Sequence, residues 1–181
     1  DASARELQLT ADGNQNLYPA FSPDDRWVAF TSVRRRGIFR VPAIGGPVQR
    51  LTDFGVQPVW SPDSQTIVFR SAGSASLSTT DYYWPAESTL WVVPATGGEA
   101  RRLTGTEGEL AGGQSFPSFS ANGAEVRFVN HFKGESSVWA LRLADGRAAV
   151  AQLAESGARA REAAKVVAQL TGLRVNDLHQ P

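Results

Sequence analysis

An all-β fold made of repeated four-stranded units is predicted by three observations on this 181-residue chain. First, one sequence pattern occurs three times, and its copies open at Pro19, Pro58 and Pro117. Second, a Ser-x-Asp or Ser-x-Asn turn follows each opening strand. Third, 39 residues separate Pro19 from Pro58, and a repeat of roughly 40 residues with four short strands is typical of a propeller blade. The sequence therefore predicts a β-propeller segment of three four-stranded blades.

The first strand and the turn of each copy follow from proline and short polar residues. Proline cannot donate to a sheet ladder, so the opening Pro is expected at a strand's first residue or at a sheet edge. In the Ser-Pro-Asp turns, Pro presets the backbone, and the Ser and Asp oxygens bond nearby amides. The third copy has Ser-Ala-Asn-Gly instead, and its Asn122-Gly123 pair makes the same turn.

The remaining strands are short apolar runs separated by glycine-containing hairpins. The second strands, such as 27–30 and 67–69, are rich in the β-branched and aromatic residues that suit a buried central strand. Gly-Gly, or Asp145-Gly146 in the third copy, predicts a hairpin into a short outer strand ending in Leu-Thr. Each third strand carries one aromatic residue: Phe39, Trp91 and Trp139.

The pattern divides the chain into a repeat region at 1–146 and a tail at 147–181. A generic antiparallel sandwich is the alternative, but it needs no recurring turn at a fixed period. The second blade is the longest, because a Ser/Gly-rich loop at 72–87 separates its second and third strands. The expected elements of the repeat region are an isolated outer strand at 5–10 and blades at 17–53, 56–105 and 114–146.

The two ends of the repeat region are complementary. Residues 5–10 resemble the outer strands at 48–52 and 100–104 but precede the first blade, whereas the third copy has no clear Leu-Thr strand. Two alternatives follow: two chains pair into a six-bladed ring by exchanging first strands, or the chain is an excerpt from a longer propeller. The chain has no methionine, even at position 1, which predicts a processed, trimmed or excerpted protein.

The tail has a different texture. Apolar and small residues between 148 and 170 recur at spacings of three and four, which predicts helices with a break at Ser156-Gly157. Gly172 suits a helix C-terminus. We expect these helices to pack on or cap the open side of the propeller, and a partner-binding or linker helix is the alternative.

The repeat words identify a family resemblance. Ser-Pro-Asp, Val-Pro-Ala-x-Gly-Gly and Arg-Leu-Thr resemble the TolB-type propeller repeat over residues 5–146. That repeat occurs in periplasmic TolB and as the N-terminal propeller of prolyl-oligopeptidase-like, tricorn-like and amidohydrolase-related proteins. The α/β domain that precedes the propeller of TolB has no counterpart here, so the resemblance implies the fold and a bacterial periplasmic or extracellular location, and does not imply TolB itself.

Composition and motifs argue against catalysis and against several partners. The charges balance at 18 basic and 18 acidic residues, which gives no reason to expect nucleic acid, and no segment is apolar enough to span a membrane. There is no cysteine, no nucleophile elbow and no metal-ligand spacing around His131 or His179. We expect no catalytic residue, no metal and no cofactor. Asp24, Asp25 and Asp63 belong to the repeated turns, where a structural role is expected.

Propeller topology indicates where a partner would bind. The loops between second and third strands share one face with the connections between blades, and aromatic residues with arginine are typical of interfaces. The alternative is a solvated hairpin tip with aromatics packed on their own loop. The predicted binding residues in these loops are Arg34, Arg35, Arg36, Tyr82, Tyr83, Trp84, His131 and Lys133, with Tyr18, Gln57 and Phe116 at the rim of the channel.

The sequence therefore predicts a non-catalytic scaffold that binds a protein or peptide. A second hypothesis makes the chain the regulatory or gating propeller of a serine peptidase or amidohydrolase. A third is sugar binding on the aromatic rim. A homodimer that closes a six-bladed ring is the expected assembly under the strand-exchange alternative.

Overall fold

The computed structural model describes residues 6–71, 87–107 and 110–143. The chain divides into two compact units, 1–141 and 142–181, and almost all described residues belong to the first. The predicted helical tail, most of the loop at 72–87 and the Asp145-Gly146 hairpin lie outside the described residues. Within the described part, no helix is long and apolar enough to cross a membrane.

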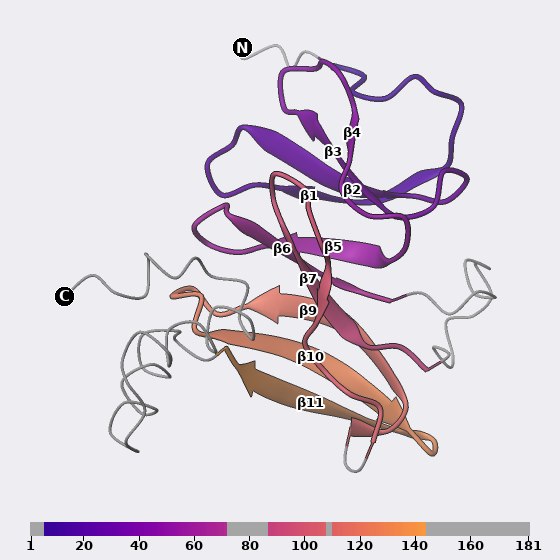
Figure 1. Cartoon of the computed structure of the whole chain (residues 1–181), viewed down its shortest axis with the longest axis vertical. Helices are drawn as coiled ribbons and strands as arrows, with labels where there is room; N and C mark the ends of the chain where they lie inside the picture. The colour runs from indigo at the N-terminus through magenta and orange to yellow at the C-terminus, as the bar shows by residue number, and fades with distance from the viewer. Residues whose placement is uncertain (1–5, 72–86, 108–109, 144–181) are drawn as a thin grey trace. The chain divides into compact units, whose positions relative to one another are not determined.

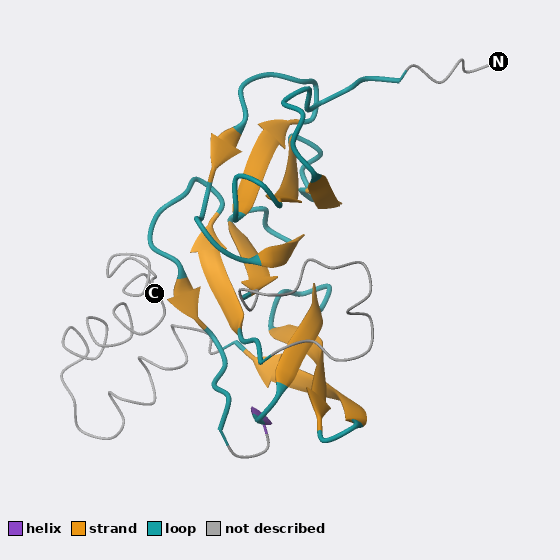
Figure 2. Cartoon of the chain, turned by 90° about the vertical axis from the view of Figure 1, so that its right-hand side faces the viewer, coloured by secondary structure: helices purple, strands orange, loops and turns teal. Residues whose placement is uncertain are grey.

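Three antiparallel sheets follow one another along the chain (Figures 1 and 2). Their strand orders are β1-β2-β3-β4, β5-β6-β7-β8 and β11-β10-β9, so each inner strand lies at a sheet edge. The prediction of an all-β segment of three propeller blades is confirmed, with three strands of the third blade among the described residues. The strands are β1 Asn16–Phe21, β2 Trp27–Ser32, β3 Ile38–Pro42, β4 Gln49–Arg50, β5 Val56–Trp60, β6 Thr66–Arg70, β7 Leu90–Pro94, β8 Arg101–Arg102, β9 Gly113–Phe119, β10 Glu125–Phe132 and β11 Glu135–Arg142.

The turn between the first two strands of each blade is built around a serine hydroxyl. Ser22 Oγ donates to Asp24 Oδ1 at 2.5 Å and accepts from Trp27 N at 2.9 Å. The same side-chain bond joins Ser61 to Asp63 at 2.5 Å and Ser120 to Asn122 at 2.8 Å. The Ser22 hydroxyl lowers the pKa of Asp24. The carboxylates of Asp24 and Asp63 therefore form part of the turns, which confirms the structural role predicted for these two residues.

Every inner strand carries a bulge immediately before its proline. Tyr18, Gln57 and Phe116 have φ values of 55°, 57° and 52°, in the left-handed region that side-chain-bearing residues rarely occupy. The register with the second strand shifts at this point in all three blades. Proline offers no N–H to the ladder, and a bulge re-aims the side chain that precedes it. We call the end of the blades where the inner strands begin the bulge end.

The first two blades pack face to face through one apolar cluster. Ile38 of the first blade and Ile67 and Phe69 of the second are fully buried in it. Trp60 of β5 lies in the same cluster, and its Nε1 donates to Ala20 O of β1 at 2.9 Å. Burial of large apolar side chains thus joins neighbouring blades, and one hydrogen bond between inner strands fixes their register.

A residue of the N-terminal segment covers the outer face of the first blade. Leu9 packs against a second cluster that contains Phe30, Phe39 and Val41. Leu51 makes the equivalent contact with the second blade, since both leucines precede a threonine in the repeat. Residues 6–10 form no strand with the described residues, so the predicted pairing of 5–10 with another blade stays a prediction.

Candidate binding site at the bulge end

The hairpins between second and third strands lie against the connections between blades. Thr52 Oγ1, which follows β4, accepts a hydrogen bond from Ile38 N at the start of β3 at 2.9 Å. Gly37 is required beside it, because a Cβ on this residue would lie 2.2 Å from Thr52 O. Thr104 repeats the first bond with Leu90 N at 2.9 Å. In the first two blades, the hairpins between second and third strands therefore contact the connections between blades at the bulge end.

Hydrogen bonds link Gln57, the bulge residue of the second blade, to both neighbouring blades. Gln57 N donates to Thr31 Oγ1 of the first blade at 3.2 Å, and Phe116 N donates to Gln57 Oε1 at 3.1 Å. Tyr18 is 46% exposed and Phe116 is 58% exposed, whereas Gln57 is half-buried. The structure therefore brings these three predicted residues into one row, with an aromatic side chain at each end and an amide between them.

His131 lies at the end of β10, in a site that the third blade supplies. Its Nε2 is 2.9 Å from Ser115 Oγ, and its Nδ1 is 2.8 Å from Ser136 Oγ. Burial lowers the pKa of His131, and the positive charge of nearby Arg70 lowers it further. Two hydroxyls thus fix the ring, and the neutral form is favoured.

Arg70 belongs to this group, although the sequence did not single it out. It ends β6 and is half-buried, and its Nε atom is buried without a hydrogen-bond partner among the described residues. Burial lowers its pKa, while its electrostatic interaction with Tyr18 raises it. The repeat contained a signal, because the equivalent positions hold Thr31 and Val129, which are short or apolar.

The arginines of the first hairpin have different surroundings. Arg35 forms an ion pair with Asp12 at 3.5 Å and lies 4.2 Å from the centre of the Phe39 ring. Hydrogen bonds from Asn14, with smaller contributions that include Arg35, lower the pKa of Asp12 to about 2. Arg34 and Arg36 are exposed. Arg35 thus contacts residues of its own chain, and the predicted binding role of the three arginines stays a prediction.

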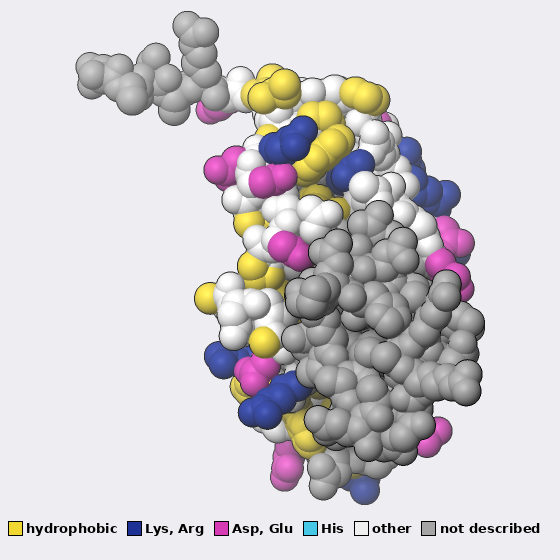
Figure 3. Space-filling model, turned by 60° about the vertical axis from the view of Figure 1, so that its left-hand side comes forward, with side chains coloured by type: hydrophobic (Ala, Val, Ile, Leu, Met, Phe, Trp, Pro, Cys, Tyr) yellow, Lys and Arg dark blue, Asp and Glu magenta, His cyan; other side chains and the backbone are white. Residues whose placement is uncertain are grey.

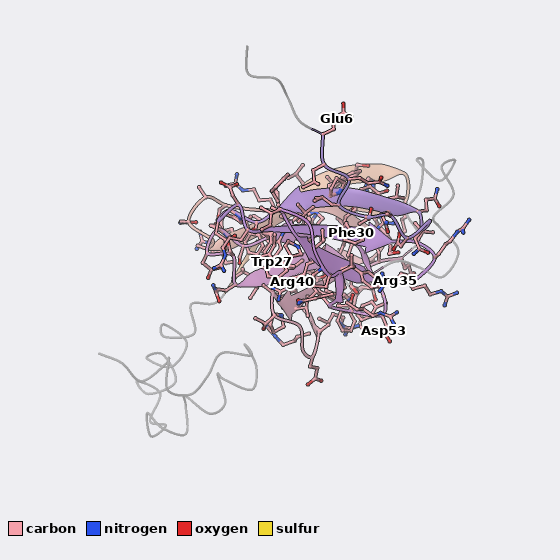
Figure 4. All side chains as sticks on the ribbon, turned by 90° about the horizontal axis from the view of Figure 1, so that it is seen from above. Glu6, Trp27, Phe30, Arg35, Arg40 and Asp53 are labelled. Atoms are coloured by element: carbon pink, nitrogen blue, oxygen red, sulfur yellow. The ribbon has the colours of Figure 1, made fainter. Side chains whose placement is uncertain are left out.

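Arginine stacking on blade 1 also occurs away from the hairpin. The Arg40 guanidinium lies 3.9 Å from the centre of the Trp27 ring, and Figure 4 labels these two residues next to each other, apart from Arg35 and Asp53. Such stacking stabilises the blade surface by about 0.5–1 kcal/mol at exposed positions. The guanidinium groups of Arg35 and Arg40 are thus engaged by rings of their own blade, which leaves them less suited to binding a partner.

The remaining predicted site residues divide into two groups. Lys133 occupies the tip of the β10–β11 hairpin with φ of 47°, and its Nζ lies 5.1 Å from the centre of the Phe132 ring. Tyr82, Tyr83 and Trp84 lie outside the described residues, so their predicted role stays a prediction.

A buried glutamine joins the second and third blades beside the site. Gln114 is fully buried, its N–H donates to Ser88 Oγ at 2.9 Å, and its Nε2 donates to Gly105 O at 2.9 Å. Its Oε1 also accepts a hydrogen bond from the Thr104 hydroxyl. A fully satisfied buried network of this kind rigidifies its surroundings, so it holds β9 and its bulge in place.

The outer edge of the first two blades offers a separate hollow. A surface cavity of about 360 Å³ is lined by residues 50–54 with Gly98 and Ala100. Figure 3 shows acidic and basic side chains interspersed over one face of the molecule. Within the described residues, no cluster of three or more His, Cys, Asp or Glu side chains suits a metal ion.

The fold and the repeated bulge define the class: the chain has a TolB-type β-propeller repeat fold. No family model matches it. The Agrobacterium fabrum protein Atu1656 is 30% identical over 141 residues, which are 74% of this chain and 46% of the relative. Tricorn protease homolog 1 of Streptomyces coelicolor is 30% identical over 152 residues, 78% of this chain and 14% of the relative. The chain thus spans less than half of either relative.

Solved structures show the same fold at low sequence identity. TolB from Acinetobacter baumannii superposes with a TM-score of 0.58 and 17% identity, over 76% of this chain and 32% of that chain. A chain of the nidogen/laminin complex superposes with a TM-score of 0.54 and 14% identity, over 71% of this chain and 44% of that chain. These similarities establish the propeller blades and leave the partner open.

Proposed function

We propose that this chain is a non-catalytic scaffold that binds a protein or peptide at the bulge end of its blades. The row of Tyr18, Gln57 and Phe116 carries the proposal. All three blades accept left-handed strain at the same position, and two of these positions present half-exposed aromatic rings. Large rigid side chains with polar neighbours are the usual anchors of protein interfaces.

Two further observations support a binding role. The buried contacts of Gln114 and the serine clamps on His131 make the site rigid, which reduces the entropy lost on binding. A chain that superposes on this one comes from a nidogen/laminin complex, so a chain of this fold occurs in a protein complex.

Selection from a random peptide display library on the full chain tests the proposal. Tyr18→Ala and Phe116→Ala truncate half-exposed rings, so the fold is retained while selected peptides lose affinity by about tenfold or more. Thr96→Ala, an exposed change in the β7–β8 hairpin, is the matched control and leaves affinity unchanged. Failure to select any peptide, or equal affinity for all variants, contradicts the proposed site.

We propose a second copy of the chain as the partner for the outer edge of the third blade, where β11 is the last strand among the described residues. β4 and β8 pair with the third strands of their blades in the registers Arg40↔Gln49 and Val92↔Arg101. The repeat makes Ala140 of β11 and Leu7 the equivalent pair, and both residues are exposed. Leu7 from one chain is therefore proposed to pair with Ala140 from another and close a six-bladed ring.

Cysteine crosslinking tests this strand exchange, because the chain contains no cysteine of its own. Directly opposed residues of antiparallel strands lie within reach of a disulfide. The double variant Leu7→Cys with Ala140→Cys is expected to form a covalent dimer on oxidation. Either single variant is the control. A product that remains monomeric contradicts the exchange.

The alternative function is the gating or regulatory propeller of a hydrolase. The observation that favours it is the similarity to 14% of a tricorn protease homolog. The gene that encodes this chain decides between the two: a hydrolase domain in the same reading frame supports the alternative, and its absence from that frame contradicts it.

A periplasmic or extracellular location belongs to the proposal and is supported by the TolB-like fold. Fractionation of cells that express the tagged natural gene tests it. Recovery of the protein in the cytoplasm alone contradicts this location.

A further inference from the structure

Arg70 carries a positive charge that the described structure leaves without a counter-ion. It is half-buried, its Nε is fully shielded from solvent, and no ion pair joins it to a described carboxylate. Shielding a guanidinium from water without a partner is costly, because each buried donor loses its hydration. An anion bound beside Arg70 would supply the missing acceptors.

Arg70 has electrostatic neighbours on both adjacent blades. Its electrostatic neighbours are Tyr18 of the first blade and His131 of the third, so residues from three blades meet there. The serine hydroxyls hold the His131 ring on both sides. Phe116, which follows Ser115 in the bulge, provides an exposed apolar wall. The group thus combines a forked donor, an imidazole and two aromatic rings.

The equivalent position in the first blade indicates where the Arg70 side chain is directed. Thr31, the equivalent of Arg70 in the first blade, accepts a hydrogen bond from the backbone N–H of Gln57, the bulge residue of the following blade. A position at the end of the second strand is thus directed at the next bulge. In the second blade, the long guanidinium replaces the hydroxyl, and the bulge N–H of Phe116 is already bonded to Gln57. The arginine therefore keeps its donors for another acceptor.

We propose that Arg70, His131, Tyr18 and Phe116 form a pocket that binds a carboxylate of the peptide partner. Arginine binds a carboxylate with two parallel N–H donors, and the aromatic rings contact the apolar part of the same peptide. This inference rests on the proposed function and specifies the chemistry that its site selects. The carboxylate belongs either to an acidic side chain or to a free chain terminus.

Three short peptides distinguish these sources. The probes are Ac-Leu-Glu-Leu-NH₂, Ac-Leu-Gln-Leu-NH₂ and Ac-Leu-Gln-Leu with a free C-terminal carboxylate, each titrated into the full chain while NMR follows the His131 ring and the Arg70 Nε–H. We expect the acidic side chain, the free terminus or both to bind at least tenfold more tightly than the uncharged peptide. Equal affinity for all three contradicts the carboxylate pocket.

Variants at Arg70 separate the pocket from a general effect of charge. Arg70→Gln is expected to remove the preference for the carboxylate, and Arg70→Lys to retain only part of it, since lysine lacks the planar fork. Arg26→Gln, an exposed arginine of the β1–β2 turn that is outside the predicted binding residues, is the control and keeps the preference. Amide spectra report whether each variant is folded, and Arg70→Lys supplies the test if Arg70→Gln unfolds.

The outcomes also separate this inference from the proposed function. Library peptides that require Tyr18 and Phe116 but bind Arg70→Gln as well as the parent chain contradict the carboxylate pocket and leave peptide binding standing. Failure of the library and of all three probes to bind contradicts both.

Discussion

The packed face between the first two blades and the outward faces of the first and third blades carry equivalent residues with opposite exposure. Trp60 in the packed face is 5% exposed, whereas its counterpart Phe21 is 63% exposed. Ile38 in the same packed face is fully buried, whereas its counterpart Val138 is 77% exposed. The same repeat positions are thus apolar in every blade, and only a neighbouring blade buries them. Phe21 and Val138 therefore occupy positions that a neighbouring blade covers elsewhere in the repeat, and no blade covers them among the described residues.

Truncation of equivalent apolar faces gives the largest expected contrast. Phe69→Ala in the packed cluster removes a fully buried ring and is expected to lower the free energy of unfolding by about 3–5 kcal/mol. Phe21→Ala at the outward face is expected to change it by less than about 1 kcal/mol in the monomer. Urea unfolding measures both. Losses of similar size would show that the two faces do not differ as described.

Glycine substitutions test the junction that positions the hairpins. Gly37→Ala combines φ of 99° with a contact 2.2 Å from Thr52 O, so we expect a loss of more than about 2 kcal/mol in unfolding free energy. Gly13 has φ of 65° and no atom within 4 Å of its would-be Cβ, so Gly13→Ala is expected to lose only about 1 kcal/mol. Thermal or urea unfolding measures the stability of both variants, of which Gly37→Ala adds a steric clash to backbone strain and Gly13→Ala adds strain alone. Equal losses of unfolding free energy would contradict the described contact between Gly37 and Thr52.

The two equivalent threonines sharpen the comparison at the blade edge. Thr52 Oγ1 accepts from Ile38 N and donates to Phe54 O, so Thr52→Val is expected to destabilise the chain by about 1–3 kcal/mol. Thr10 makes no side-chain hydrogen bond to the described residues, and Thr10→Val is expected to be neutral in the monomer. Under strand exchange, Thr10→Val instead weakens dimerisation, which a dilution series detects. Equal losses of monomer stability at Thr10 and Thr52 would contradict the described difference in their side-chain hydrogen bonds.

The pH response of His131 is the smallest expected effect. Its pKa lies below the ordinary value of 6.5, since burial and Arg70 disfavour the charged form. The unfolded chain therefore binds the proton more readily, so the stability contributed by His131 is present above pH 6.5 and is lost as pH falls through the folded pKa. NMR titration should give a midpoint below 6.5 that rises in Arg70→Gln. A midpoint at or above 6.5 would contradict the assigned surroundings.

Local features of this fold were predictable from sequence, because short-range chemistry determines them. The Ser-x-Asp turns are closed by residues two positions apart, as in Ser61 with Asp63, so the pattern alone identified them. Tyr18, Gln57 and Phe116 were predicted at the channel rim from their place at the start of the inner strands, whereas the left-handed bulge that they form was not predicted.

Contacts between blades were not predictable in the same way. Arg70 was overlooked because its neighbours, Tyr18 and His131, are distant in sequence and belong to other blades. Arg35 was taken as a binding residue, yet it lies on Phe39 and pairs with Asp12, a residue outside the repeat pattern. A charged residue at a repeat position that is otherwise short or apolar was the signal that would have identified Arg70.

We propose that a second copy of the chain covers the outward blade faces at Phe21 and Val138. The solution mass of the chain, measured by light scattering across a dilution series, tests this claim most directly. We expect a species at twice 19.4 kDa at the higher concentrations, which dissociates on dilution. A chain that stays at 19.4 kDa at all concentrations, with Phe21 and Val138 still exposed, would contradict it.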